Sequence, residues 1–153
     1  VHGSKPKYYH HVIGGNFRLD PLQAAVVSIK LPHLDQYHDN RINNAQYYNA
    51  NLDKQYTTPF VRNNYKMIYN QYTIRTENRD SLSQYLSENQ IGNMIYYPVP
   101  LHLQKCFADL GYQEGDCPEA EKASKEVLSI PIFPELREEE RTYITETLNS
   151  RSF

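Results

Sequence analysis

Two adjacent glycines, a short polar turn and an abrupt helix start occupy residues 13–25, and this stretch constrains the fold more than any other. The glycines allow backbone conformations that other residues avoid. Asp20 is a suitable N-cap, and Pro21 suits the first position of a helix. The sequence therefore predicts that Asn16 and Arg18 lie on a constrained loop that leads into a firmly started helix.

Residues 19–52 have the pattern of a one-sided helix. Apolar side chains recur at the spacing i, i+3, i+4, i+7 in Leu22, Ala25, Val26 and Ile29. Pro32 should kink or break this helix, because a proline inside a helix removes a hydrogen bond and clashes with the preceding turn. We therefore expect two helical arms or one bent helix.

From Lys66 onward, strand patterns and helix patterns alternate. The predicted order is a strand at 66–76, a helix capped by Asp80, a strand at 94–97, a turn or short helix at 101–111, a helix from 118, a strand at 128–133 and a helix at 138–148. This order predicts the α+β class, with a long connecting helix followed by a short β-sheet covered on one face by helices.

The composition of the chain argues against several classes of partner and location. Sixteen basic and eighteen acidic residues give a net charge of −2, which argues against nucleic-acid or anionic-membrane partners. No apolar run approaches the roughly 20 residues that span a bilayer, and no secretory signal is visible. We therefore expect a cytoplasmic protein. The start at Val1, without an initiator Met, suggests a fragment of a longer chain.

Metal and disulfide signals are weak. Cys106 and Cys117 do not form a metal-ligand pattern. A disulfide between them is an alternative, but two thiols in a non-secreted chain favour the reduced state. His10 and His11 are adjacent but lack a third ligand nearby, so we interpret them as polar loop residues or as contacts for an anionic ligand.

The segment from Tyr96 to His102 is the second place that suggests chemistry. Tyr96, Tyr97 and His102 stand at the end of a predicted strand, on a backbone stiffened by two prolines. Such a rigid cluster of hydrogen-bonding groups can hold a phosphate or a sugar. The alternative interpretation is a rigid aromatic corner with no ligand.

Two segments, at residues 10–25 and 97–131, resemble the DegT/DnrJ/EryC1/StrS family of sugar aminotransferases, which depend on pyridoxal phosphate. The first segment carries His-His-Val-Ile-Gly-Gly-Asn-Phe-Arg-Leu-Asp, and the second begins Tyr-Pro-Val-Pro-Leu-His-Leu-Gln. The resemblance implies the type I fold of aspartate aminotransferase and covers essentially the whole chain.

The resemblance also implies that this chain is the C-terminal part of a longer protein. Residues 1–18 would end the large domain in an interface loop, 19–56 would form the connecting helix region, and 57–153 would form the small α+β domain. No lysine here matches the family's Schiff-base lysine, so we expect the isolated chain to be inactive and to supply no catalytic residue.

The resemblance implies ligand roles for those residues of this chain that match the family's motifs. Asn16 would reach over a homodimer interface to the phosphate of the partner subunit's pyridoxal 5'-phosphate. Tyr96, Tyr97 and His102 would contact the nucleotide-sugar substrate, and His11, with His10, is a further candidate from the same side of the dimer. No metal site is expected.

Three functions remain open at this point. The first is transfer of an amino group, from glutamate, to a nucleotide-linked keto-sugar. The second is sugar dehydration, as in relatives that carry histidine in place of the Schiff-base lysine. The third is a non-catalytic interaction or regulatory module.

Overall fold

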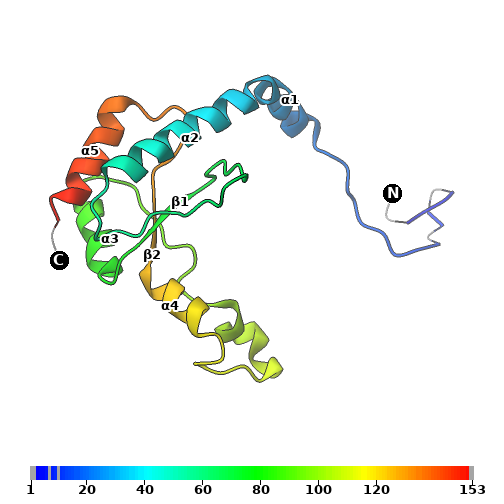
Figure 1. Ribbon diagram of the computed structural model, residues 1–153. Coiled ribbons are helices and arrows are strands. Elements are labelled where there is room, and N and C mark those ends of the chain that lie inside the picture. Colours follow the sequence, from blue (N-terminus) through cyan, green and yellow to red (C-terminus); the bar gives the residue numbers. More distant parts are fainter. Residues whose placement is uncertain (1–2, 7, 10, 152–153) are drawn as a thin grey trace. The chain divides into compact units, whose positions relative to one another are not determined.

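The computed structural model describes residues 3–6, 8–9 and 11–151, and Figure 1 shows the elements that they form. The chain divides into two compact units, residues 1–35 and residues 36–153. Each unit is described by itself. The predicted domain boundaries after residues 18 and 56 stay predictions.

The first unit contains helix α1 (Pro21–Lys30) and the 3-10 turn η1 (Leu31–His33). Helix α2 (Leu34–Asn51) begins at its end and continues into the second unit. No residue of α1 is buried. The prediction of a helical stretch interrupted at Pro32 is confirmed, because the 3-10 turn that contains this proline separates two α-helices.

The second unit is built around a two-stranded antiparallel sheet. Strand β1 (Tyr72–Arg75) pairs with β2 (Val127–Ile130), so that Tyr72 lies opposite Ile130 and Arg75 lies opposite Val127. The other elements are α3 (Arg79–Glu88), η2 (Leu101–Leu103), η3 (Lys105–Leu110), α4 (Pro118–Glu126) and α5 (Glu138–Asn149). The predicted α+β class is confirmed.

The core of the second unit lies between the sheet and helices α2, α3 and α5 (Figure 1). Its largest fully buried side chains are Tyr48, Tyr72, Ile74, Leu82, Leu86, Leu128 and Leu148. The buried tyrosines keep their hydroxyl groups bonded: Tyr48 donates to Pro131 O at 3.0 Å and Tyr72 donates to Asn49 Oδ1 at 2.6 Å. A tyrosine-rich core is therefore stable, since buried polar groups need partners.

Buried Arg79 connects the start of α3 to the end of α4. Its Nη1 donates to Ser124 O at 3.0 Å and to Val127 O at 3.5 Å. The last carbonyl groups of a helix have no partner within the helix, and a guanidinium group satisfies them favourably. This contact lies where the chain passes from α4 into β2 and stabilises that junction.

Three predicted element boundaries are wrong. The strand predicted at 66–76 begins only at Tyr72, because Tyr69 adopts a left-handed backbone conformation with φ 49° that a strand does not tolerate. The strand predicted at 94–97 is a single bridge between Met94 and Ser129. Helix α3 begins after Asn78, so Asp80 lies in its first turn and does not cap it.

Candidate functional site

The loop at residues 14–19 ends in a capped helix, as predicted. Oδ1 of Asp20 accepts hydrogen bonds from Leu22 N at 3.0 Å and from Gln23 N at 3.1 Å. These bonds satisfy two of the backbone donors that a helix start leaves free, and Pro21 occupies the first helical position. The end of the loop is therefore fixed by its own sequence.

Asn16 lies exposed on this loop and is held by its neighbour Arg18. Its Oδ1 accepts hydrogen bonds from the backbone N of Arg18 at 3.3 Å and from the Arg18 Nε at 3.0 Å. Because both Arg18 groups are donors, the atom that faces them is the amide oxygen, which leaves the Nδ2 group of Asn16 to donate. An N–H donor beside a guanidinium group fits a phosphate.

The histidine pair is described only in part. His11 is exposed, and its backbone N donates to Gly3 O at 3.0 Å. His10 lies outside the described residues. His11 belongs to the first unit, so its predicted role at the substrate stays a prediction.

Tyr96 and Tyr97 lie together at a groove in the second unit. Their ring centroids are 5.7 Å apart, with the rings at 69°. The groove has a volume of about 390 Å³. One wall is the segment 96–104, and the other is helix α4, which contributes Ala120 and Ala123. The tyrosines thus combine apolar faces with hydroxyl groups at the mouth of a mostly apolar hollow.

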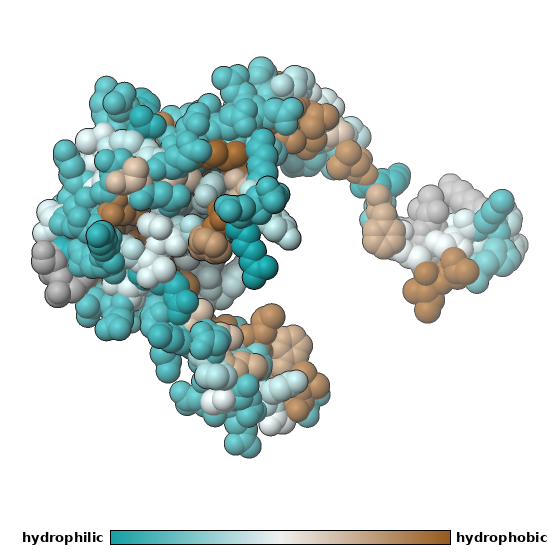
Figure 2. All heavy atoms as spheres, viewed as in Figure 1, coloured by the Kyte–Doolittle hydropathy of each residue, from teal (hydrophilic) through white to brown (hydrophobic). Residues whose placement is uncertain are grey.

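His102 does not line this groove. It lines a neighbouring hollow of about 340 Å³ with Leu101, Phe107 and Tyr112. Its side chain is only 9% exposed, and its Nε2 lies 2.9 Å from Glu121 Oε1. The structure therefore brings the two tyrosines together at one hollow and places His102 at the neighbouring one, and the two hollows share Leu101. In Figure 2, apolar side chains gather at this end of the second unit.

Glu121 was not a candidate from the sequence, but it has the most hydrogen-bonded carboxylate of this region. Besides the bond from His102, it accepts bonds from Gly115 N at 2.9 and 3.0 Å and from Cys117 N at 3.2 Å. Burial by itself raises the pKa of the Glu121 carboxyl, but these hydrogen bonds outweigh it and hold the pKa below its ordinary value. In the sequence, this residue looks like any glutamate in the first turns of a helix.

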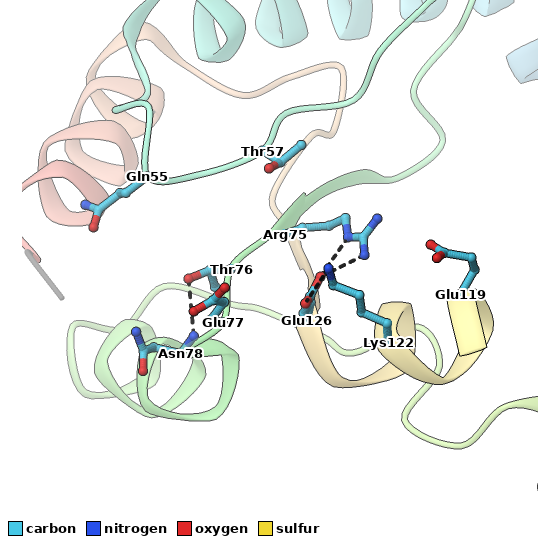
Figure 3. A pocket seen from close by; sticks show the side chains of 9 residues that line it. All are labelled: Gln55, Thr57, Arg75, Thr76, Glu77, Asn78, Glu119, Lys122 and Glu126. Carbon is cyan, nitrogen blue, oxygen red and sulfur yellow. Dashed lines mark hydrogen bonds and ion pairs between the residues drawn. The ribbon is translucent and has the colours of Figure 1, made fainter. Parts of the chain in front are cut away.

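A larger and more polar hollow, of about 490 Å³, lies between β1, α4 and the connector at residues 55–57 (Figure 3). Arg75 reaches into it and is paired with Glu126, with Nη2 and Oε2 2.7 Å apart. None of the site residues predicted from the sequence lines it. Because its most buried charges already neutralise each other, we do not assign it a ligand.

Metal and membrane signals are absent from the described part of the chain. Residues 3–6, 8–9 and 11–151 contain no group of three histidine, cysteine or acidic side chains that could hold a metal ion. Cys106 and Cys117 are both free thiols, as favoured from the sequence. Within the same residues, no helix has both the length and the apolar character that a bilayer span requires.

Comparison with known proteins gives consistent matches along the chain. A model of the DegT/DnrJ/EryC1/StrS aminotransferase family matches residues 1–149. A protein of Geobacillus stearothermophilus named pleiotropic regulatory protein is 51% identical over 152 residues, which are 97% of this chain and 41% of that protein. The UDP-N-acetyl-3-dehydro-alpha-D-glucosamine 3-aminotransferase of Acidithiobacillus ferrooxidans is 41% identical over 142 residues, which are 91% of this chain and 37% of that enzyme.

The fold matches solved structures equally well. The crystal structure of DesV from S. venezuelae superposes with a TM-score of 0.91 at 34% identity. The superposition covers 99% of this chain and 42% of DesV. The chain therefore spans about two fifths of the length of the proteins that it matches.

Proposed function

The chain belongs to the DegT/DnrJ/EryC1/StrS aminotransferase family, and on that basis we propose that it is the C-terminal part of a longer aminotransferase dependent on pyridoxal phosphate. The longer protein would transfer an amino group from glutamate to a keto-sugar linked to a nucleoside diphosphate. The relative from Acidithiobacillus ferrooxidans, whose name states such a reaction, supports this substrate class.

The observation that carries the proposal is the arrangement of Asn16. Its amide oxygen is occupied by Arg18, so its Nδ2 group is left to donate to an anion. We propose that this group donates to a phosphate oxygen of the cofactor bound by the partner subunit of a homodimer. When bound, pyridoxal phosphate supplies the electron sink for the reaction, and Asn16 contributes to holding its phosphate in place.

The tyrosine groove is the proposed contact for the nucleotide sugar. Tyr96 is 39% exposed and Tyr97 is 71% exposed, so each residue offers accessible surface to a ligand. Aromatic faces pack against sugars and bases, while hydroxyl groups bond to their polar atoms. His11 stays a further proposed contact. For His102, burial against Glu121 supports an indirect role.

A steady-state assay of the longer protein tests this function. With pyridoxal phosphate, glutamate and a UDP- or dTDP-linked 3-keto-sugar, we expect formation of an amino sugar together with an equal amount of 2-oxoglutarate. Loss of a sugar hydroxyl with no consumption of glutamate would instead establish the dehydratase alternative. A histidine at the Schiff-base position upstream would predict that result.

A regulatory role is the second candidate, because the relative at 51% identity is named a pleiotropic regulatory protein and one at 40% identity is named a sensory transduction protein. A purely regulatory protein would turn over neither glutamate nor any nucleotide sugar. We also propose that the 153-residue chain alone binds no cofactor through a lysine. An absorbance band of lysine-bound pyridoxal phosphate in this chain would contradict the proposal.

A further inference from the structure

The tyrosine groove has two walls that come from separate parts of the chain. The first wall is the irregular segment 96–104, which contains only the short 3-10 helix η2. The second wall is the face of α4 that carries Ala120, Ala123 and Ser124. Neither wall is part of the paired sheet for most of its length, so the width of the groove depends on what joins the walls directly.

The His102–Glu121 hydrogen bond makes this connection. His102 is the neighbour of Leu101 in the first wall, and Glu121 is the neighbour of Ala120 in the second. Among the described residues, no other side-chain hydrogen bond joins segment 96–104 to α4. Both side chains are about nine-tenths buried, at 9% and 10% exposure, so water competes little for the bond.

The same carboxylate also fixes the loop that returns the chain from the first wall to the second. Gly115 has φ 97°, a left-handed conformation that favours glycine, and its N–H points at both carboxylate oxygens of Glu121. The N–H of Cys117, just before α4, donates to the same group. One carboxylate thus gathers η2, the returning loop and the start of α4.

We infer that Glu121 is a positioning residue for the tyrosine groove and acts through His102. It holds the imidazole with Nε2 bonded to the carboxylate, and this bond keeps Tyr96 and Tyr97 at a fixed spacing from α4. The inference rests on the proposed function, since it assumes that this groove receives the nucleotide sugar. It gives His102 a structural reason to be next to the site without contact to the substrate.

The test compares Glu121→Gln, His102→Ala and the double variant in the longer protein. Glutamine keeps the size of the side chain but offers one acceptor oxygen and no charge, so it cannot receive all of these bonds. We expect both single variants to weaken binding of the probes UDP and dTDP, measured by calorimetry, by about tenfold. The KM for the nucleotide sugar should rise alongside, while the KM for glutamate stays unchanged. The double variant should bind UDP and dTDP no more weakly than the single variant that has the lower affinity.

A second readout does not depend on the substrate. Hydrogen exchange measured by mass spectrometry should speed up in segments 96–104 and 111–117 of Glu121→Gln. The matched control is Glu119→Gln, which removes an exposed carboxylate from the same helix turn and should change neither exchange nor binding.

The two readouts separate the possible failures. Unchanged exchange in Glu121→Gln, additive losses in the double variant, or a lowered melting temperature with unaltered UDP and dTDP affinity would each overturn the positioning role. Faster exchange in a protein that binds neither nucleotide and converts no nucleotide sugar would instead overturn the proposed function and leave the connection between the walls in place.

Discussion

Nε of Arg18 lies 3.0 Å from Oδ1 of Asn16, so two exposed side chains of one loop hold each other in position. A free asparagine amide can present either its oxygen or its nitrogen to a ligand. Here the guanidinium group and a backbone N–H occupy the oxygen. The loop is therefore organised in advance to offer an N–H donor next to a positive charge.

Asn16→Ala in the longer aminotransferase should weaken retention of pyridoxal phosphate by about tenfold, because a hydrogen bond to a charged group contributes roughly 1.5–3 kcal/mol. Cofactor remaining after exhaustive dialysis, followed by absorbance, measures this. Asn43→Ala, at an exposed position in α2, is the control and should retain the cofactor. Equal retention in both variants would remove the phosphate role of Asn16.

Asp20→Ala should lower the free energy of unfolding by about 1 kcal/mol, because it removes the acceptor of two backbone N–H groups at the start of α1. Thermal unfolding measures the loss. Asp20→Asn is the control, since asparagine caps helices about as well as aspartate. If Asp20→Asn destabilises as much as Asp20→Ala, the negative charge matters more than the hydrogen bonds.

Where local rules decide the structure, the sequence predicted it well. The start of α1 at Asp20 and Pro21, the break at Pro32 and the end of η3 at Gly111 all follow from backbone restrictions or capping at single residues. Prediction of the α+β class required only the alternation of strand and helix patterns, together with the family resemblance.

Where contacts between side chains, and not backbone rules at single residues, decide the structure, the sequence was a poor guide. Residues 66–71 have strand-forming side chains, but the left-handed backbone at Tyr69 lets its ring pack on Tyr72, with the ring centroids 5.9 Å apart. The role of Glu121 depends on His102, which lies 19 residues earlier. No local pattern distinguishes such a glutamate from those on the exposed face of a helix.

Leu86→Ala should lower the free energy of unfolding by about 2–5 kcal/mol, because Leu86 is fully buried between α3 and the rest of the core and its truncation leaves a cavity. Denaturant unfolding measures this loss. The slope of the free energy of unfolding against denaturant concentration should stay unchanged, so that the shift in midpoint reports stability alone. Leu86→Met conserves most of the volume and should lose less than about 1.5 kcal/mol. A loss below 1 kcal/mol in Leu86→Ala, on the order of an exposed substitution, would contradict the assigned core.

Alkaline pH should destabilise the fold through its buried tyrosines. Burial raises the pKa of Tyr56 from 10.0 to about 12, and the carboxylate of Asp53 adds to this effect. Below pH 10 the hydroxyl is neutral in both states. Between pH 10.0 and about 12 the Tyr56 hydroxyl ionises in the unfolded chain but stays neutral in the folded chain. The free energy of unfolding therefore falls as the pH rises through this range.

The variant Tyr56→Phe separates the contribution of Tyr56 to this alkaline loss of stability from that of the other buried tyrosines. The variant should lose about 1 kcal/mol at neutral pH, because the hydroxyl donates to Leu148 O at 2.8 Å in a buried site. It should also show a flatter decline of Tm above pH 10 than the wild type. An identical decline in both proteins would mean that Tyr56 ionises equally easily when folded.

Acid pH should release the contacts of Glu121. Its carboxyl pKa lies below the ordinary value of 4.5 in the folded state, since the bonds from His102, Gly115 and Cys117 favour the charged form more than burial opposes it. The stabilisation from this group is therefore complete above 4.5, the pKa of the unfolded chain, and is lost as the pH falls through the lower folded pKa.

The difference in Tm between the wild type and Glu121→Gln should consequently be largest above pH 4.5 and shrink as the pH falls below that value. Thermal unfolding across this range measures the gap between them. Glu119→Gln removes a carboxylate that accepts no hydrogen bond from the described residues, so its curve should stay parallel to the wild type. A constant gap between wild type and Glu121→Gln at every pH would show that the NH2 group in place of a carboxylate oxygen, and not the lost charge, accounts for the loss of stability.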